Sequence, residues 1–167
     1  MKPNVPHPPQ TSHPWRRGLV LAGFLVLCFG AAAVGSPFIP GDWYAGLTKP
    51  AWNPPSWVFG PVWTALYTMM AVAAWLVWQR SAGGVRRLAL GLFLAQLVLN
   101  AAWTPLFFGL HLLGVALAEM LLLWVAIAAT IVAFHRVHRL AAWLLVPYLA
   151  WVSFAAFLNL ALWRLNA

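Results

Sequence analysis

Apolar residues fall into five long runs along this chain. The runs are Gly18–Ile39, Val62–Trp78, Leu88–Leu110, Leu112–Phe134 and Leu140–Trp163. Each contains roughly 17 to 24 residues, and an α-helix of that length crosses the ~30 Å hydrocarbon layer of a membrane. A transmembrane β-barrel needs strands of alternating polarity, which these runs lack. The pattern therefore predicts an all-α fold, an integral membrane bundle of five transmembrane helices.

The residues around the runs set the expected helix limits. We expect helices at 16–39, 58–79, 86–108, 111–135 and 139–164, joined in one transmembrane domain over residues 16–167. Residues 1–15 are rich in proline and histidine, cannot bury a core and are expected to form a disordered tail. The first run follows Arg16-Arg17, as an export signal would. It is longer than the apolar region of a signal, which favours a retained helix.

Composition and charge agree with a membrane location. Hydrophobic residues make up 63% of the chain and charged residues 7%, whereas soluble domains carry about 25% charged residues. A net charge of +8 is typical of a nucleic-acid-binding protein. Here most basic residues lie at the ends of the apolar runs, as membrane topology requires, so no nucleic-acid partner is expected. The N-terminus and the connections after the second and fourth runs hold eight of the ten Lys and Arg residues, and the other side holds Lys49 and Arg164. This bias predicts a cytoplasmic N-terminus and a C-terminus outside.

Metal and disulfide chemistry have little support in the sequence. The single cysteine, Cys28, lies inside the first run, which excludes an internal disulfide. His135 and His138 have no acidic or cysteine neighbour, so they are predicted to belong to a solvated loop and not to a metal site. We expect no metal and no obligatory cofactor.

The connection between the first two runs combines tryptophan with proline. From Trp43 to Trp63 the sequence WYAGLTKPAWNPPSWVFGPVW holds four tryptophans and four prolines. Proline restricts its own φ and the residue before it, so residues 40–57 should form a stiff loop. Two interpretations stay open: an aromatic belt at the membrane surface, or a cap over a pocket for a flat, apolar ligand.

Three runs each place polar and aromatic residues on one helical face. Residues three and four apart share a face, and polar side chains in hydrocarbon need partners inside the bundle. The faces hold Trp63, Tyr67, Met70 and Ala74 in the second run, Gln96, Asn100, Trp103 and Thr104 in the third, and Pro147, Trp151, Ala155 and Asn159 in the fifth. Interhelical hydrogen bonding alone would account for the polar side chain of Gln96 in a membrane span. The small Ala155 between Trp151 and Asn159 instead favours a pocket.

Glu119 is the sole carboxylate inside an expected span. An acid at that depth suggests proton or cation coupling. No intramembrane Lys or Arg is available to pair with it, so we favour a structural role in which the carboxyl reaches the helix end or accepts a local hydrogen bond.

Motifs along most of the chain resemble one membrane family. They are Trp43-Tyr44, Lys49-Pro50, Pro54-Pro55, Gly60-Pro61-Val62-Trp63, Gln96-Leu97, Leu99-Asn100, Phe107-Phe108-Gly109, Pro147-Tyr148-Leu149-Ala150-Trp151, Leu158-Asn159 and Trp163-Arg164. In their order and spacing, over residues 18–166, they resemble the TspO/MBR family. Its members include the tryptophan-rich sensory proteins of bacteria and the mitochondrial translocator protein, or peripheral benzodiazepine receptor.

The resemblance implies a pocket under residues 40–57 that binds tetrapyrroles, such as protoporphyrin IX and haem, and isoquinoline carboxamide or benzodiazepine ligands. The pocket residues that it carries over are Trp63, Tyr67, Asn100, Trp103, Trp151, Ala155 and Asn159. From the loop we add Trp43 and Trp52, and Lys49 as the charge partner of a propionate. Ligation of haem iron has less support, because His111, His135 and His138 lie at helix ends.

One departure from the family concerns sterols. Eukaryotic members carry a tyrosine in a cholesterol motif near the C-terminus, and this chain has Leu160 at the corresponding position. Such motifs are weak evidence even when intact. A porphyrin-centred role in a bacterial cell membrane is therefore favoured over sterol binding.

Three kinds of function stay open. A tetrapyrrole-binding sensor or regulator is favoured. A transporter is the alternative, although the chain has neither an internal repeat nor paired intramembrane charges. The resemblance also implies light-dependent breakdown of bound protoporphyrin, with Trp63 and Trp151 as redox-active neighbours. The sequence contains no hydrolytic triad, metal cluster or nucleotide motif, so ordinary catalysis is not expected.

Assembly is suggested by two small residues in the third run. Gly91 and Ala95 form a small-xxx-small pair, which permits close approach of two membrane helices. The family resemblance also implies homodimers, with this helix at the contact. The alternative is that Gly91 packs inside its own bundle.

Overall fold

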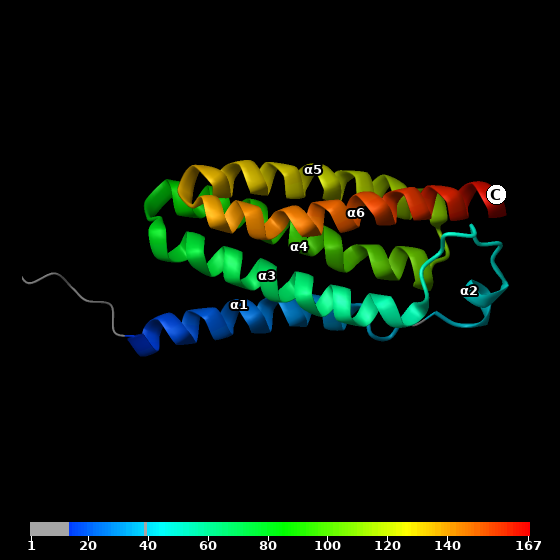
Figure 1. The fold of residues 1–167 in the computed structure, drawn as a ribbon, viewed down its shortest axis with the longest axis horizontal. Coiled ribbons are helices and arrows are strands. Elements are labelled where there is room, and N and C mark those ends of the chain that lie inside the picture. Colours follow the sequence, from blue (N-terminus) through cyan, green and yellow to red (C-terminus); the bar gives the residue numbers. More distant parts are fainter. Residues whose placement is uncertain (1–13, 39) are drawn as a thin grey trace, which may run out of the picture.

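The computed structural model describes residues 14–38 and 40–167. Its five long helices are α1 Pro14–Val34, α3 Phe59–Arg80, α4 Gly83–Thr104, α5 Leu113–Val137 and α6 Arg139–Asn166 (Figure 1). Three short elements complete it: α2 Asp42–Gly46, the 3₁₀ turn η1 Ser56–Val58 and the π-helical turn η2 Pro105–Gly109. The expected disordered tail lies outside the described residues, except that α1 already begins at Pro14.

All five long helices are long and apolar enough to cross a membrane. The described part of the chain contains no β-strand. These findings confirm the prediction of an all-α bundle of five transmembrane helices.

The long helices form a ring around a shared core. α1 packs against α3 and α4, α3 against α6, α6 against α5, and α5 against α4. Cys28 is the one fully buried residue of α1 among those described, so this helix lies at the edge of the bundle. Figure 1 shows the loop that carries α2 at the same end of the molecule as the C-terminus. The connections α3–α4 and α5–α6 lie at the other end, and the helix ends beside them carry five of the eight arginines.

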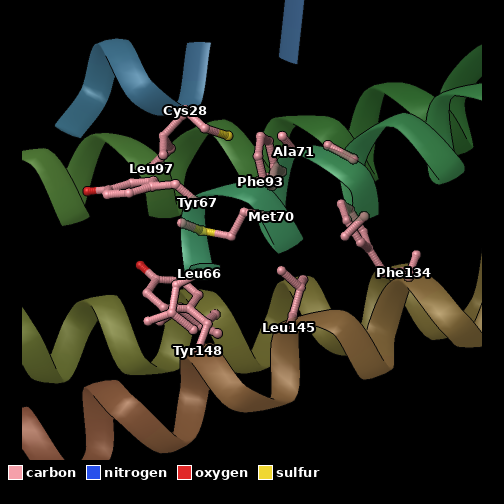
Figure 2. Packing of buried hydrophobic residues seen from close by; sticks show 14 of the residues in the cluster. Cys28, Leu66, Tyr67, Met70, Ala71, Phe93, Leu97, Phe134, Leu145 and Tyr148 are labelled. Atoms are coloured by element: carbon pink, nitrogen blue, oxygen red, sulfur yellow. The ribbon is translucent and has the colours of Figure 1, made fainter. Parts of the chain in front are cut away.

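The core combines large and very small side chains. Phe93, Phe134, Met70 and Tyr148 are almost fully buried, and they come from α4, α5, α3 and α6 (Figure 2). Alanines between them, including Ala71, Ala73, Ala74, Ala141 and Ala142, let the helix backbones approach closely. Lipid provides no hydrophobic driving force between helices, so close contact and interhelical hydrogen bonds hold such a bundle together.

Most helix ends lie within one to three residues of the sequence-based expectation, and two differ by more. α1 ends at Val34 and not at residue 39, because Pro37 has no N–H to continue the helix and disfavours helical backbone before it. A Cβ on Gly35 would lie 3.1 Å from the Thr104 side chain, so glycine allows α1 to meet α4 here. The third span continues past Thr104 as the π-helical turn, where the Leu110 N–H donates to the Pro105 carbonyl at 2.9 Å.

Candidate functional site

A cavity of about 690 Å³ lies under residues 40–57, which we call the lid loop. All five long helices contribute to its wall, together with the lid loop and the π-helical turn. The wall is mainly aromatic and aliphatic. Among the described residues that line it, none carries a charge. Ligand pockets of about 300–1,000 Å³ with apolar walls and a few polar groups are typical of small-molecule sites.

One hydrogen-bond chain joins three helices at the inner end of the cavity. The Tyr67 hydroxyl on α3 donates to Asn100 Oδ1 on α4 at 2.5 Å, and Asn100 Nδ2 donates to the Tyr148 hydroxyl on α6 at 2.9 Å. All three residues are buried. In hydrocarbon an unpaired amide or phenol is costly, so this chain both satisfies the groups and fixes the helices relative to one another.

A second set of hydrogen bonds fixes the wall near the lid. Trp103 Nε1 donates to Asn159 Oδ1 at 3.2 Å, and Asn159 Nδ2 donates to the Leu113 carbonyl at 2.8 Å. The Trp103 ring also stacks on Phe107 of the π-helical turn, with centroids 4.8 Å apart. This tryptophan therefore has one orientation, set by contacts on its N–H and on its ring.

The remaining indoles of the wall are held by rings alone. Trp63 lies 5.4 Å from Tyr67 and 6.3 Å from Tyr148, measured between ring centroids. Trp151 contacts Phe59 at 5.8 Å and Phe154 at 5.5 Å. Ala155, one turn after Trp151, keeps the wall open because its side chain is a single methyl group.

The lid loop is fastened to the bundle at several points. The Asn166 side chain, at the end of α6, accepts from the Thr48 N–H at 2.8 Å and donates to the Thr48 carbonyl at 2.9 Å. Tyr44 donates to Asn53 Oδ1 at 3.3 Å within the loop. Burial raises the pKa of Tyr44, and the hydrogen bond to Asn53 opposes that shift.

Two aromatic contacts close the edge of the lid. The Trp43 ring stacks on His111 with centroids 3.9 Å apart. His111 adopts a φ of 58°, an uncommon backbone conformation for a residue with a side chain. A Cβ on Gly109 would lie 2.7 Å from the Phe38 ring, so only glycine allows Phe38 to pack here.

Seven of the ten residues expected to bind ligand line the cavity. They are Trp63, Tyr67, Asn100, Trp103, Trp151, Ala155 and Asn159. The three lid residues do not. Trp43 packs on His111, Trp52 is half-exposed and contacts Phe154, and the Lys49 ammonium donates to the carbonyls of Ala45 and Leu47 at 3.0 and 3.1 Å.

Gln96 and Glu119 lie outside the cavity wall. Gln96 Nε2 approaches Met70 Sδ at 3.9 Å, an interhelical contact of the kind expected for this residue. Both Glu119 carboxyl oxygens are buried and have no hydrogen-bond partner in the described part of the chain. The local hydrogen bond expected for Glu119 is therefore not made.

Several wall residues were not assigned from the sequence. Phe107 and Phe108 stand in a quoted motif, but the π-helical turn that directs them inward has no periodic signature. Tyr44 and Asn53 come from the lid loop, where side-chain direction does not follow a helical period. Tyr148 is buried and supports the wall through its hydrogen bond to Asn100 and its ring contact with Trp63. Pro147, which was expected on the inward face, is exposed and does not line the cavity.

Comparison of the whole chain with known proteins assigns it to a family. The model of the TspO/MBR family matches residues 22–164, which include every residue that lines the cavity. The chain belongs to the TspO/MBR family. The match covers both hydrogen-bond sets of the cavity, so they are part of the family's domain.

Individual TspO/MBR relatives extend over most of the chain. The human translocator protein is 48% identical over 160 residues, which is 92% of each chain. The tryptophan-rich sensory protein of Cereibacter sphaeroides is 43% identical over 143 residues, 86% of this chain and 89% of the relative. The tryptophan-rich protein TspO of Chlorobaculum tepidum is 43% identical over 155 residues, 89% and 96% of the two chains. With its five spans, this TspO/MBR protein is an integral multi-pass membrane protein.

Proposed function

We propose that the protein binds a tetrapyrrole, such as protoporphyrin IX, in the cavity under the lid loop and acts as a sensor or regulator of tetrapyrrole level or stress. The observation that carries this proposal is the cavity itself: about 690 Å³, walled by aromatic rings and without a charged side chain among its described lining residues. A macrocycle offers a large π face, which such rings bind by stacking and by burial of apolar area.

The cavity residues have separate roles in this proposal. Trp63 and Trp151 lie against the faces of the macrocycle. Trp103 forms a rigid part of the cavity wall, because Asn159 accepts from its N–H and Phe107 stacks on its ring. The amides of Asn100 and Asn159 are already engaged with protein groups, so they orient the walls more than they bind ligand. Isoquinoline carboxamide and benzodiazepine ligands, which are also flat and apolar, would use the same rings.

The charged propionates constrain the pose. An unpaired carboxylate is costly inside an uncharged cavity, so the propionates point to the lid and water. Lys49 is the basic residue of the lid loop and hence the candidate partner, but its ammonium would have to leave the Ala45 and Leu47 carbonyls first. No histidine or cysteine lines the cavity in the part of the chain described, so the metal-free macrocycle fits the residues better than haem does.

The experiment is a titration of the purified protein with protoporphyrin IX, followed by absorbance in darkness and then under light. Saturable binding in darkness is expected. Absence of saturable binding contradicts the proposal. A change of the bound spectrum that requires light and oxygen would support breakdown of the ligand, for which Trp63 and Trp151 are the oxidisable neighbours in the wall. Uptake by sealed vesicles that contain the protein would support the alternative, a transporter.

We infer that the protein lies in a bacterial cell membrane with its N-terminus in the cytoplasm. Arg80, Arg86, Arg87, Arg136 and Arg139 belong to the end of the bundle opposite the lid loop, and the positive-inside rule places that end in the cytoplasm. The lid and the mouth of the cavity then face away from the cytoplasm. A reporter that is active only outside the cytoplasm should be active when fused after Ala167, and inactivity there would reverse the orientation.

A further inference from the structure

A second hollow lies on the outer surface of the bundle. It is a groove of about 460 Å³ between α3 and α6, with Ala65 and Met69 on one side and Ala150 and Phe154 on the other. Ala65 and Ala150 are exposed, and both helices are membrane spans, so the groove opens to the hydrocarbon of the bilayer.

Trp151 belongs to both hollows. It is the one described residue that lines the groove and also lines the cavity under the lid loop. The indole is therefore a partition between the ligand cavity and the lipid.

The indole of Trp151 is held by fewer contacts than that of Trp103. Its Nε1 makes no hydrogen bond to the described residues, and its ring contacts only the rings of Phe59 and Phe154. Trp103, by contrast, is held by Asn159 and by stacking on Phe107. Rotation of the Trp151 indole thus breaks no hydrogen bond.

The helix beside this partition also has a weak point. Pro147 lies in the interior of α6, four residues before Trp151 and on the rim of the groove. Proline removes one i→i−4 hydrogen bond and allows the helix to bend there. No side-chain hydrogen bond joins α3 directly to α6 in the described part of the chain, and beside the groove the two helices meet through the ring contact of Phe59 with Trp151.

We propose that apolar ligands enter and leave the cavity sideways from the bilayer, through the groove between α3 and α6, with Trp151 as the gate. The proposal rests on the ligand binding proposed above and adds the route. A flat, apolar ligand partitions into hydrocarbon, where the groove is open. The alternative route through the lid would break the Asn166–Thr48 pair and the Tyr44–Asn53 hydrogen bond.

The test fills the groove and leaves the cavity wall unchanged. Ala65→Phe and Ala150→Phe each place a ring in the groove from opposite helices, and neither alanine lines the cavity. Ala118→Phe, on the exposed face of α5, is the matched control. Association and dissociation of protoporphyrin IX are followed by its fluorescence in lipid nanodiscs. We expect both rates to fall about tenfold in the groove variants with the affinity nearly unchanged, since access is altered and the bound state is not.

Two further variants separate the routes. Trp151→Ala should accelerate both association and dissociation, although its affinity will fall because Trp151 also lines the cavity. Asn166→Ala loosens the lid and should leave both rates unchanged.

The outcomes are distinct. Unchanged rates in Ala65→Phe and Ala150→Phe, with binding intact, overturn the lateral route and leave the proposed function standing. Acceleration by Asn166→Ala alone assigns entry to the lid and also overturns it. Failure of the unmodified protein to bind protoporphyrin IX overturns the proposed function, and the route falls with it.

Discussion

At the scale of residues, the cavity depends on pairing polar groups without using charge. Asn100 supplies an acceptor to Tyr67 and a donor to Tyr148, which an amide can do and a carboxylate cannot. Asn159 acts in the same way between Trp103 and the Leu113 carbonyl. The helices around the cavity are thus positioned by neutral groups, and the aromatic rings remain available to a ligand.

Asn100→Leu should destabilise the protein more than removal of the whole hydrogen-bond chain does. Leucine is of similar size but leaves the hydroxyls of Tyr67 and Tyr148 unpaired in the core, which costs about 1–3 kcal/mol. The triple variant Tyr67→Phe, Asn100→Leu, Tyr148→Phe has no unpaired group and should recover part of that loss. Thermal unfolding in detergent measures both. Equal midpoints for the single and triple variants would mean that the hydroxyls find other partners.

Replacement of Trp63 and Trp151 by phenylalanine should weaken protoporphyrin IX binding and leave the fold intact. Each substitution keeps a ring but removes stacking area and an N–H. Neither N–H is hydrogen-bonded to the described residues, so the unfolding midpoint should change little. Trp124→Phe, which loses the 2.9 Å hydrogen bond to Ser153 away from the cavity, is the control. An unchanged affinity and unchanged photochemistry in the double variant would show that Trp63 and Trp151 do not contact the ligand.

At the scale of elements, the lid loop behaves as part of the bundle because α6 holds it. Asn166 pairs with both the N–H and the carbonyl of Thr48, as a neighbouring β-strand would, and also donates to the Leu162 carbonyl of its own helix at 2.8 Å. The stiff lid expected from its prolines is therefore completed by a contact between residues far apart in the sequence.

Asn166→Ala should loosen the lid without unfolding the helices. Exchange of the Thr48 amide hydrogen, which loses its acceptor, should accelerate by about tenfold, the change that corresponds to one hydrogen bond of roughly 1.4 kcal/mol. Amides in the core of α3 should be unaffected. Asn166→Asp keeps the acceptor for the Thr48 N–H and should show a smaller acceleration. Slow exchange of Thr48 in Asn166→Ala would mean that other contacts hold the loop.

The sequence predicts helical elements much better than it predicts the lid. The period of 3.6 residues placed Trp63, Asn100, Trp151 and Asn159 on inward faces, and the structure brings them to one cavity. Trp43, Lys49 and Trp52 have no such period to orient them, because a loop directs each side chain through local backbone angles and distant contacts. The Lys49 ammonium accordingly binds loop carbonyls, and the close approach of Gly35 to Thr104 is a contact between distant residues that no period predicts.

At the scale of the whole molecule, an exposed small-residue face of α4 supports a homodimer. Gly91 and Ala95 are both exposed, and a Cβ on Gly91 would meet no atom of the described chain within 4 Å. The alternative in which Gly91 packs inside its own bundle is therefore wrong. Small residues on a lipid-facing surface allow a second copy to approach closely.

We propose that this face of α4 forms a homodimer contact, in which case Gly91→Leu with Ala95→Leu should shift the protein from dimer to monomer in mild detergent and leave protoporphyrin IX binding largely unchanged. The two positions lie outside the cavity wall, so the binding site is not altered. Size-exclusion chromatography with light scattering measures the mass. Leu121→Ala, at an exposed position on α5, controls for changes in surface size away from this face. Persistence of the dimer would place the contact on another helix.

The π-helical turn has a consequence for insertions and deletions. Its hydrogen bond from Leu110 to Pro105 encloses one more residue than an α-helical bond does, so η2 holds a surplus residue in the last turn of the third span. Deletion of Leu106 should let the segment close as an ordinary helix, rotated by about 100° per lost residue. The shortened chain should keep its helix content, measured by circular dichroism, but Phe107 would leave Trp103 and the affinity for protoporphyrin IX should fall. Related proteins that have this turn should therefore tolerate insertions and deletions in their extramembrane loops more readily than the deletion of one residue from the turn.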